Sequence, residues 1–506
     1  MAKPSDKYHD KLTTKKQLLD WFEQGCTEKD NLVIGAEHEK IIFYKDDFSP
    51  VPYEGEDGKS GIKDILLYLQ ENFNWKPSYE DGNVIRLDKD GASVTLEPGG
   101  QIELSGAPLQ NMHEIANETA NHFNELLEAC ETHGMDALGL GYHPTMNFED
   151  SPLMPMSRHK TFFNHFASHG YKTAQKLMVA SSSTQVNLGY RSEEDMVKKL
   201  RVGLALQPIA SALFANSPFE DGKLSENQST RSHITHNAAD GRYGFMLPVA
   251  FEDDFGFERY TDFILNEMPL MGIYHQDHFL WLQHTTSFVE CVKGPIPGLE
   301  DEHQMTLDDW YNHINTVWPE VRMRQWLEMR GSDVGSSEEM INALPAFWVG
   351  LLYDDETLDK AYDIIKDWSN KEREYLREKT PKAGLDTEFR GAPLWELAKS
   401  LVELSDQGLR NRNVQNEQGL HEGVYLKPLH DLLDAKQTQS EELIEKYETK
   451  WDKDVSNVFN EYSFLARQRK QQHAAAANSN NKKHKHAMKQ KTQQQRKAKK
   501  NDRYKR

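Results

Sequence analysis

The chain has 506 residues, of which 37% are hydrophobic and 10% are aromatic, and it carries a formal net charge of −20. These values indicate a globular protein with a large core, divided into two or three packed subdomains. No membrane-spanning segment is expected. The longest uncharged stretch, residues 202–219, contains two prolines, a glutamine and an asparagine, and therefore predicts a buried helix.

The termini and the cysteines indicate where the protein works. The first ten residues, MAKPSDKYHD, have no apolar core, so no signal peptide is expected. Cys26, Cys130 and Cys291 are too widely spaced for a disulfide framework or a zinc pattern. We therefore expect a cytoplasmic protein that does not associate with membranes.

Charge is distributed unevenly along the chain. Residues 467–506 contain 15 Lys and Arg against one acid, Asp502, which leaves residues 1–466 with a net charge of −34. An acidic body does not bind polyphosphate by itself. If its substrate is a nucleotide, divalent metal ions must supply the positive charge.

The hydrophobic pattern predicts the elements in chain order. A capped amphipathic helix is expected over residues 14–25, and strand-like segments follow at 32–36, 41–44, 84–88, 93–97 and 101–105. Helices are expected at 111–133, with Cys130 on the apolar stripe as a core residue, and from the cap Ser192 toward Asn216. The later chain is mostly helical, at 340–352, 357–378, 394–406 and 439–466. Strands concentrated in the first two-thirds predict an α+β fold with a mostly antiparallel sheet.

The last segment differs from the rest of the chain. Residues 467–506 combine low apolar content with dense positive charge, which predicts a disordered tail after a body of residues 1–466. The tail lacks a base-stacking platform, since Tyr504 is its one aromatic residue. A solvated extension, or a weak nucleic-acid contact, is the expectation.

The run IGAEHEKIIF (34–43) places two acids inside an apolar strand. Glu37 and Glu39 point to the same face, because side chains alternate along a strand. Carboxylates this close repel each other unless a cation or a strong donor lies between them. The run is either a half-exposed strand with a wet acidic face or a metal site.

Two further stretches repeat this pattern. In VTLEPGGQIELSG (94–106), Glu97 and Glu103 share parity on either side of a Pro-Gly-Gly turn; they are either loop-tip acids or further ligands. In SSSTQVNLGY (181–190), Gln185 and Asn187 point to one face of a strand. Neutral amides suit oxygen coordination or substrate hydrogen bonds, and equally a polar outer face.

Basic residues complete the pattern. In WLEMRGSD (326–333), Glu328 and Arg330 share a face, either as a plain ion pair or as a metal ligand beside a phosphate-binding arginine. Upstream, Arg231 and Arg242 are candidates for holding a substrate carboxylate. Acids on several strands of an acidic body predict a multi-metal ATP site. No Walker A motif, kinase loop or Rossmann fingerprint is present, so the nucleotide would be held mainly through metals.

Several long runs resemble the glutamate–cysteine ligases of the plant and proteobacterial type. These runs are IGAEHEKIIF, LEPGGQIELSGAPL, STQVNL, RSHITH, WPEVRMRQWLEMRGSD and ALPAFWVGLLYD, in matching order from about residue 14 to about residue 460. The resemblance implies a glutamine-synthetase-like fold, a funnel of curved antiparallel sheet surrounded by helices. It also implies joining of the γ-carboxylate of L-glutamate to the amine of L-cysteine with ATP, the first step of glutathione biosynthesis.

By that resemblance each candidate residue receives a role. Two or more Mg²⁺ ions would be held by Glu37, Glu39, Glu97, Glu103 and Glu328, with Arg330 on the γ-phosphate. Arg231 would bind the glutamate α-carboxylate, and Tyr274 would form a wall of the cysteine pocket. Gln185 and Asn187 fall where related ligases have a histidine as metal ligand, and with Arg242 they are our candidates for contacting substrate. A redox switch like that associated with plant relatives is not expected, because the three cysteines match no regulatory pairing.

The sequence leaves two other functions open. A sister ligase could use another amine in place of cysteine, because one or two pocket residues can change the acceptor. A non-catalytic protein could bind nucleic acid through the basic tail, although intact acids at every matched position argue against a retired site.

Overall fold

The computed structural model describes residues 11–470, except 239–240, 276–277, 295, 297–298 and 300–302. Of the predicted tail, residues 467–470 continue a C-terminal helix, in which Arg467 Nη2 donates a hydrogen bond to Ser336 Oγ at 3.2 Å. Residues 471–506 lie outside the described part, so the prediction of disorder stays a prediction.

A nine-stranded antiparallel sheet forms the centre of the fold, as the sequence predicts. Its strand order is β12-β13-β7-β1-β5-β4-β3-β2, and β6 pairs with the far end of β1. The strands are β1 (Ile34–Tyr44), β2 (Lys76–Glu80), β3 (Asn83–Lys89), β4 (Ala92–Leu96), β5 (Ile102–Ser105), β6 (Met135–Leu138), β7 (Thr184–Leu188), β12 (Val321–Met323) and β13 (Leu327–Met329).

Strand β1 organises this sheet. The two short segments expected at 32–36 and 41–44 form one strand of 11 residues, which pairs with β5, β6 and β7. The acids between the two apolar ends stay in the strand because Glu37 pairs with Gln185 and Glu39 pairs with Glu103 across the ladders. Both glutamates therefore sit in the middle of the sheet.

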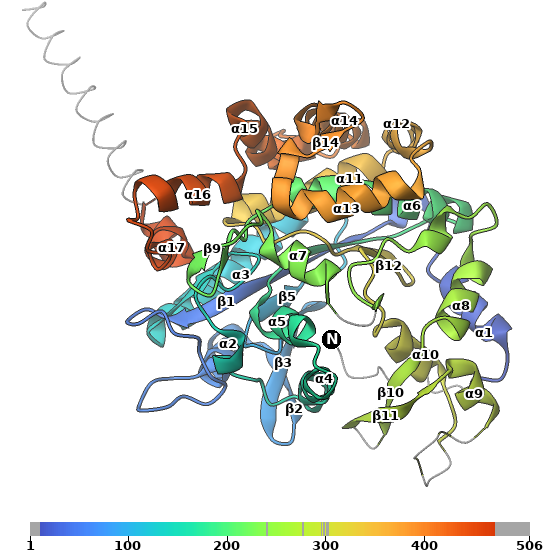
Figure 1. The fold of residues 1–506 in the computed structure, drawn as a ribbon, viewed down its shortest axis with the longest axis horizontal. Coiled ribbons are helices and arrows are strands. Elements are labelled where there is room, and N and C mark those ends of the chain that lie inside the picture. Colours follow the sequence, from blue (N-terminus) through green and yellow to red (C-terminus); the bar gives the residue numbers. More distant parts are fainter. Residues whose placement is uncertain are drawn as a thin grey trace, which may run out of the picture.

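Helices surround the sheet (Figure 1). The larger ones are α1 (Lys15–Glu23), α2 (Ile62–Phe73), α3 (Met112–Thr132), α4 (Ser157–Ser168), α5 (Lys172–Ala180), α6 (Glu193–Leu213), α7 (Thr230–His236), α8 (Phe257–Asn266), α10 (Leu307–Ile314), α11 (Glu338–Leu352), α12 (Asp355–Ile365), α13 (Asn370–Ala383), α14 (Leu394–Arg412), α15 (Lys427–Ala435) and α16 (Gln439–Thr449). The shorter helices are α9 (Phe288–Lys293) and α17 (Asn457–Tyr462), and hairpins are formed by β8 (Phe219–Glu220) with β9 (Lys223–Leu224), β10 (Leu270–His275) with β11 (His278–Thr286), and β14 (Glu388–Phe389) with β15 (Ala392–Pro393). Helices α11 to α16 gather at the top of Figure 1, and the β10–β11 hairpin lies at the lower right with α9 and α10.

Two hydrophobic cores cover opposite parts of the molecule. The larger joins β7 to α6, α11 and α14, and includes Leu188, Leu206 and Trp348. The second packs α2 and α3 against β3, β4 and β5. It includes Cys130, which is fully buried as predicted, and burial raises the pKa of its thiol. Among the described residues, no helix is long and apolar enough to span a membrane.

The predicted helix at 394–406 begins where expected but continues to Arg412, and two other predicted long helices are broken. The Ser192 side chain caps α6 as predicted, by accepting a hydrogen bond from the Asp195 amide. The helix expected at 357–378 is two helices, because Ser369 caps α13 with a hydrogen bond from the Glu372 amide. The helix expected at 439–466 ends at Thr449, since Asp452 and Lys453 adopt left-handed backbone angles.

Candidate active site

One face of the sheet borders a polar cavity of about 360 Å³. Strands β1, β5, β7, β12 and β13 contribute one wall, and α4, α5 and α7 contribute residues opposite. Six glutamates line the cavity (Glu37, Glu39, Glu97, Glu103, Glu320 and Glu328), as do six arginines (Arg86, Arg158, Arg231, Arg322, Arg324 and Arg330). Dense charge of both signs in a concave site is typical of a site for highly charged ligands.

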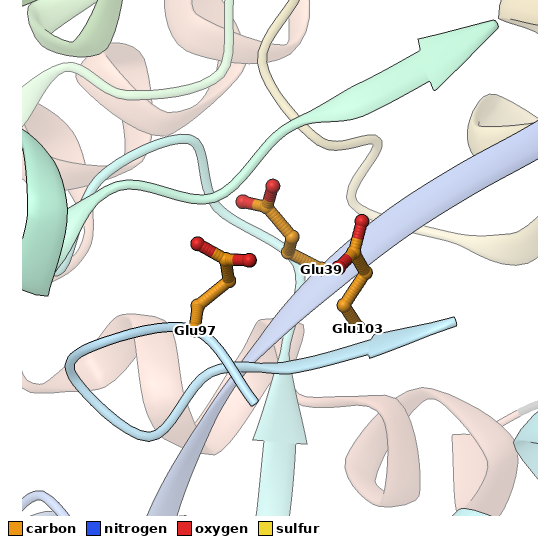
Figure 2. Close-up of side chains that lie close together, drawn as sticks. All are labelled: Glu39, Glu97 and Glu103. Carbon is orange, nitrogen blue, oxygen red and sulfur yellow. The ribbon is translucent and has the colours of Figure 1, made fainter. Parts of the chain in front are cut away.

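Three of the glutamates form a cluster, which we call the carboxylate triad: Glu39, Glu97 and Glu103. Each offers an oxygen, and these oxygens lie within 4.8 Å of one another. Figure 2 shows the three side chains converging from β1, from the turn after β4 and from β5. That turn brings Glu97 back to the sheet through a hydrogen bond from the Gly100 amide to the Glu97 carbonyl, with Gly100 at φ +88°.

Neighbouring amide and hydroxyl groups orient the triad. Ser183 donates to both carboxylate oxygens of Glu39, through its amide at 2.8 Å and its hydroxyl at 2.9 Å. Thr95 Oγ1 donates to Glu103 Oε2 at 2.7 Å. Burial raises the pKa of Glu39, and burial together with the charges of Glu103 and Glu39 raises the pKa of Glu97 well above its usual range. Three carboxylate oxygens this close together fit a hard divalent cation such as Mg²⁺.

Glu37 lines the cavity beside the triad but is not a member of it. Its Oε1 accepts a hydrogen bond from Asn187 Nδ2 at 2.8 Å, and Trp326 Nε1 in turn donates to Asn187 Oδ1 at 2.9 Å. Burial, with the charges of Glu103 and Glu328, raises the pKa of Glu37 to about 7. The predicted same-face pair is therefore confirmed, but the two acids have different neighbours.

Glu328 is surrounded by arginines. Its oxygens lie 2.6 Å from Arg322 Nε, 3.3 Å from Arg324 Nη2 and 3.0 Å from Arg330 Nη1, and its side chain is 1% exposed. Burial alone would raise its pKa, but the three guanidinium groups hold it well below its usual range. Glu328 thus acts as the counter-ion of an arginine cluster, and its predicted role as a metal ligand stays a prediction.

Arg330 connects that cluster to the triad. Its Nη1 donates to Gln185 Oε1 at 2.8 Å, and Gln185 Nε2 lies 3.4 Å from Glu39 Oε1. Arg231, on α7, lies close by, because its Nη1 and Nη2 donate to the carbonyl oxygens of Gly331 and Arg330, each at 3.0 Å. Cationic donors and the carboxylate triad therefore share one wall of the cavity.

Three residues predicted to bind substrate lie outside the cavity lining. Asn187 sits behind Glu37. Arg242 is buried and donates to the backbone carbonyl oxygens of Thr316 and Pro269. Tyr274, on β10, packs its ring edge against Phe279 with 5.3 Å between ring centroids. Each is positioned to support the fold around the cavity.

The sequence reasoning missed Glu320, Arg322 and Arg324. The signal was present in the stretch WPEVRMRQWLEMR, where these three residues alternate with apolar ones. They share parity with Glu328 and Arg330, which the β12–β13 pairing brings opposite: Arg322 pairs with Glu328. Short strands of three residues gave too weak a pattern to reveal this.

Comparisons with known proteins agree with one another. A sequence model of glutamate-cysteine ligase family 2 (GCS2) matches residues 33–461. The chloroplastic glutamate–cysteine ligase B of Oryza sativa subsp. japonica is 41% identical over 448 residues, which cover 88% of this chain and 87% of the rice protein. The chloroplastic glutamate–cysteine ligase of Arabidopsis thaliana is 39% identical over 448 residues, which cover 88% of this chain and 82% of that protein.

A solved structure extends the comparison to the fold. The glutamate–cysteine ligase of Francisella tularensis, in complex with AMP, superposes with a TM-score of 0.50 and 11% sequence identity, covering 84% of this chain and 86% of that chain. This likeness confirms the predicted glutamine-synthetase-like fold class. With a family match over most of its length and relatives near 40% identity, the chain belongs to glutamate–cysteine ligase family 2.

Proposed function

We propose that this protein joins the γ-carboxylate of L-glutamate to the amine of L-cysteine, using ATP, through a γ-glutamyl phosphate intermediate. The observation that carries this proposal is the link from the carboxylate triad through Gln185 to Arg330 on one cavity wall. A carboxylate is a poor electrophile, so it must be phosphorylated before an amine attacks it. That step brings two anions together, and the cavity supplies groups that stabilise both.

Mg²⁺ fits the triad and would be held by Glu39, Glu97 and Glu103, with Glu37 and Glu328 as further predicted ligands. When bound, Mg²⁺ neutralises phosphate oxygens that the acidic wall would otherwise repel. Ser183 and Thr95 keep the Glu39 and Glu103 carboxylates oriented toward that position. ATP and two or more Mg²⁺ ions are thus the expected nucleotide and metals.

The arginines act on the transferring phosphoryl group and on the amino acid. Arg330, fixed between Gln185 and Glu328, is placed to stabilise charge on the γ-phosphate. Arg231 is our candidate for the glutamate α-carboxylate, because its Nε has no hydrogen-bond partner among the described residues. The amine of cysteine then attacks the acyl carbon, and phosphate leaves.

ADP release by the purified protein tests this function. The assay contains Mg-ATP and glutamate, with and without cysteine, and parallel reactions replace cysteine with glycine, alanine or 2-aminobutyrate. Cysteine-dependent ADP release with γ-glutamylcysteine as product is expected. Turnover with another amine alone would identify that amine as the acceptor in place of cysteine. Absence of turnover with any amine would contradict the ligase proposal. The cytoplasmic location and a weak nucleic-acid contact through the tail stay predictions from the sequence.

A further inference from the structure

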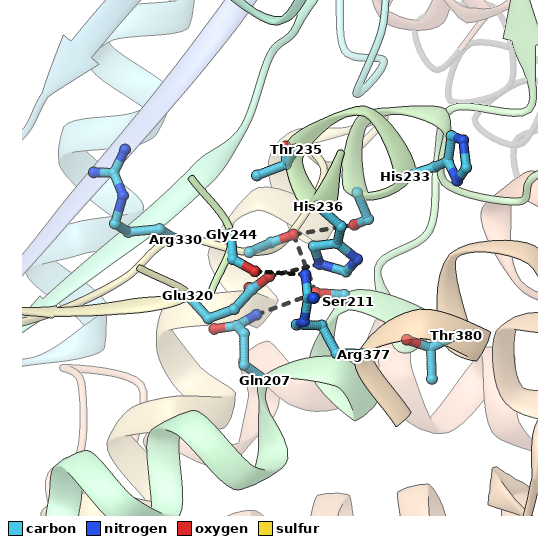
Figure 3. A network of polar contacts seen from close by, with 12 residues as sticks. Gln207, Ser211, His233, Thr235, His236, Gly244, Glu320, Arg330, Arg377 and Thr380 are labelled. Atoms are coloured by element: carbon cyan, nitrogen blue, oxygen red, sulfur yellow. Dashed lines mark hydrogen bonds and ion pairs between the residues drawn. The ribbon is translucent and has the colours of Figure 1, made fainter. Parts of the chain in front are cut away.

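Like Glu37, a second acid on the cavity wall lies outside both the triad and the arginine cluster around Glu328. Glu320 precedes β12, is 4% exposed and lines the cavity. Its Oε1 lies 2.6 Å from Nε2 of His236, at the end of α7. Within the described part of the chain, no residue donates a hydrogen bond to Oε2. Figure 3 shows the Glu320 side chain directed toward the His236 ring.

Two glycines lie next to the Glu320–His236 pair, at positions where a larger side chain would overlap it. A Cβ atom at Gly331, which also lines the cavity, would overlap Glu320 Oε2. A Cβ atom at Gly244 would lie 3.0 Å from His236 Cδ2, and Gly244 has φ +56°. Glu320 Oε2 therefore lies beside the Gly331 backbone at the cavity wall, with the Gln207 side chain next to it.

Glu320 also lies beside the residues that hold the opposite charge. The Arg330 amide donates to the Glu320 carbonyl oxygen at 3.2 Å. Arg231 donates to the carbonyl oxygens of Arg330 and Gly331. Burial lowers the pKa of its guanidinium, and the charges of Asp333, Glu39 and Glu320 act in the opposite direction. A carboxylate and a guanidinium thus flank residues 330–331, and Arg231 Nε has no hydrogen-bond partner among the described residues.

This arrangement matches an α-amino acid, whose ammonium and carboxylate groups share one carbon atom. Receptors for the two groups must therefore be adjacent and of opposite charge. We propose that Glu320, oriented by His236, receives the α-ammonium group of the donor amino acid while Arg231 receives its α-carboxylate. The proposal rests on the ligase function and extends it to the residue that distinguishes an amino acid from a plain dicarboxylic acid.

The donor, and not the acceptor, is the amino acid that this pair fits. The acceptor amine must lose a proton and attack the acyl carbon, which an ammonium held by a carboxylate cannot do. The donor ammonium takes no part in the reaction, so it can stay ionised throughout. The His236 tautomer that carries its proton on Nε2 donates to Glu320 Oε1 and so orients the carboxylate.

Glutarate, which is glutamate without the α-ammonium group, tests the proposal. ADP release is measured with saturating Mg-ATP and cysteine, with either glutamate or glutarate as donor. In Glu320→Gln, kcat/KM for glutamate is expected to fall about 100-fold, mainly through KM, because the ammonium then lacks a charged partner. The value for glutarate is expected to change less than about threefold, so the preference for glutamate disappears.

Two variants complete the design. His236→Gln keeps a hydrogen-bond donor but changes its position, and is expected to weaken the preference for glutamate by about tenfold. Glu226→Gln makes the same chemical change at an exposed glutamate outside the cavity lining, and should leave the preference unchanged. Thermal unfolding of all variants checks that the fold is intact.

An unchanged glutamate-to-glutarate ratio in Glu320→Gln would overturn the proposal, as would an equal loss with both donors. Calorimetric titration of glutamate and glutarate into wild type and Glu320→Gln, with a non-hydrolysable ATP analogue, separates this from failure of the ligase function. Glutamate binding that depends on Glu320, without turnover, would support the receptor and contradict the reaction. Glutamate binding that ignores Glu320 would contradict the receptor alone.

Discussion

At the scale of single residues, the three arginines around Glu328 lower the pKa of that carboxylate. Arg322 and Arg324 have side chains that are 2% and 8% exposed, and the cavity-lining Arg330 completes the cluster. Positive charges this close repel one another unless an anion lies between them. Glu328 therefore keeps the cationic wall of the cavity folded.

The first prediction concerns that counter-ion. Glu328→Gln leaves buried guanidinium groups unpaired, so it should lower the free energy of unfolding by about 3–5 kcal/mol. Urea unfolding measures this, with Glu226→Gln as the exposed control. A near-wild-type stability combined with weaker activation by Mg²⁺ would instead identify Glu328 as a metal ligand.

Removing a carboxylate from the triad should stabilise the metal-free protein, whereas removing the Glu328 carboxylate should destabilise it. At a pH above the raised pKa of Glu97, Glu97→Gln removes one of the mutually repelling buried charges, so the metal-free protein should unfold at a higher temperature than wild type. The rise in Tm that Mg²⁺ gives the wild type should be lost, since the variant lacks a ligand. Thermal scans with EDTA and with Mg²⁺ measure both effects. A triad that binds no metal would show the same Mg²⁺ response in both proteins.

Turnover provides a separate test of the pair on β1. Glu37→Gln and Glu39→Gln should each lower kcat by on the order of 100-fold or more with little loss of fold, because both carboxylates line the reaction site. The measurement is ADP release, with circular dichroism as the check on folding. ADP formation close to that of wild type in either variant would remove that residue from the proposed site.

At the scale of elements, α11 and α14 cross at unusually close range. Gly350 on α11 and Gly408 on α14 make this contact, and a Cβ at Gly408 would overlap the Gly350 carbonyl oxygen. That oxygen also accepts a hydrogen bond from Thr357 Oγ1 at 2.8 Å. The crossing joins the C-terminal helices to the larger core, which covers the far side of β7.

Filling this crossing should separate the helices. Gly408→Ala is expected to destabilise the protein by about 1–3 kcal/mol, despite the better helix propensity of alanine, because both backbones must move. Lys399→Ala, at an exposed position of the same helix, is the matched control. Chemical unfolding compares them, and a more stable Gly408→Ala protein would show that the two helices can separate without cost.

The sequence predicted those parts of the fold and site that depend on local pattern. Parity placed Glu37 and Glu39 on one face of β1, and the Ser192 cap fixed the start of α6. Parity could not show that Glu39 faces Glu103 while Glu37 faces Gln185, because cross-strand register depends on the whole sheet.

The same limit applies to the arginines. The sequence identified Arg242 as a candidate because of its charge, but its donors are bonded to backbone carbonyl oxygens. Arg322 and Arg324, on and beside a strand of three residues, alternate with apolar residues over too short a stretch to predict their place in the cavity. Which arginine faces the cavity depends on tertiary packing, which spacing along the chain does not report.

At the scale of the whole molecule, buried histidines link stability to pH. Burial lowers the pKa of His143 and of His313 to about 3, against about 6.5 in an unfolded chain. Below pH 6.5 the unfolded state therefore binds protons that the folded state does not. Their contribution is complete above pH 6.5 and is lost as the pH falls toward 3.

This predicts a loss of stability on mild acidification. Each histidine contributes a slope of up to about 1.4 kcal/mol per pH unit within that window. His143→Asn keeps an acceptor for the Met146 amide but cannot titrate, so its unfolding free energy should fall less than that of wild type between about pH 7 and pH 5. His169→Asn, at an exposed histidine, is the control. Parallel pH dependences for His143→Asn and wild type would contradict the assignment.

The acidic body (residues 1–466) and the basic tail should have functions that can be tested separately. A chain ending at Lys470 keeps every residue that lines the cavity, so its kcat for ADP release should match that of the full chain. Retention on immobilised RNA should fall, and more so at low salt, because the removed segment is rich in Lys and Arg. Loss of turnover on truncation would make the tail part of the catalytic unit.

The central place of β1 has a consequence for how this protein tolerates mutation. Its odd positions 37 and 39 face the cavity, while His38 between them stacks on Phe123 of α3 and Lys40 is fully buried. Neighbouring positions of one strand are therefore under different selection. Substitution at 37 or 39 should yield a folded protein without activity, whereas substitution at 38 or 40 should yield a protein that fails to accumulate. A scan of abundance and activity along residues 37–40 should alternate between these two phenotypes with a period of two.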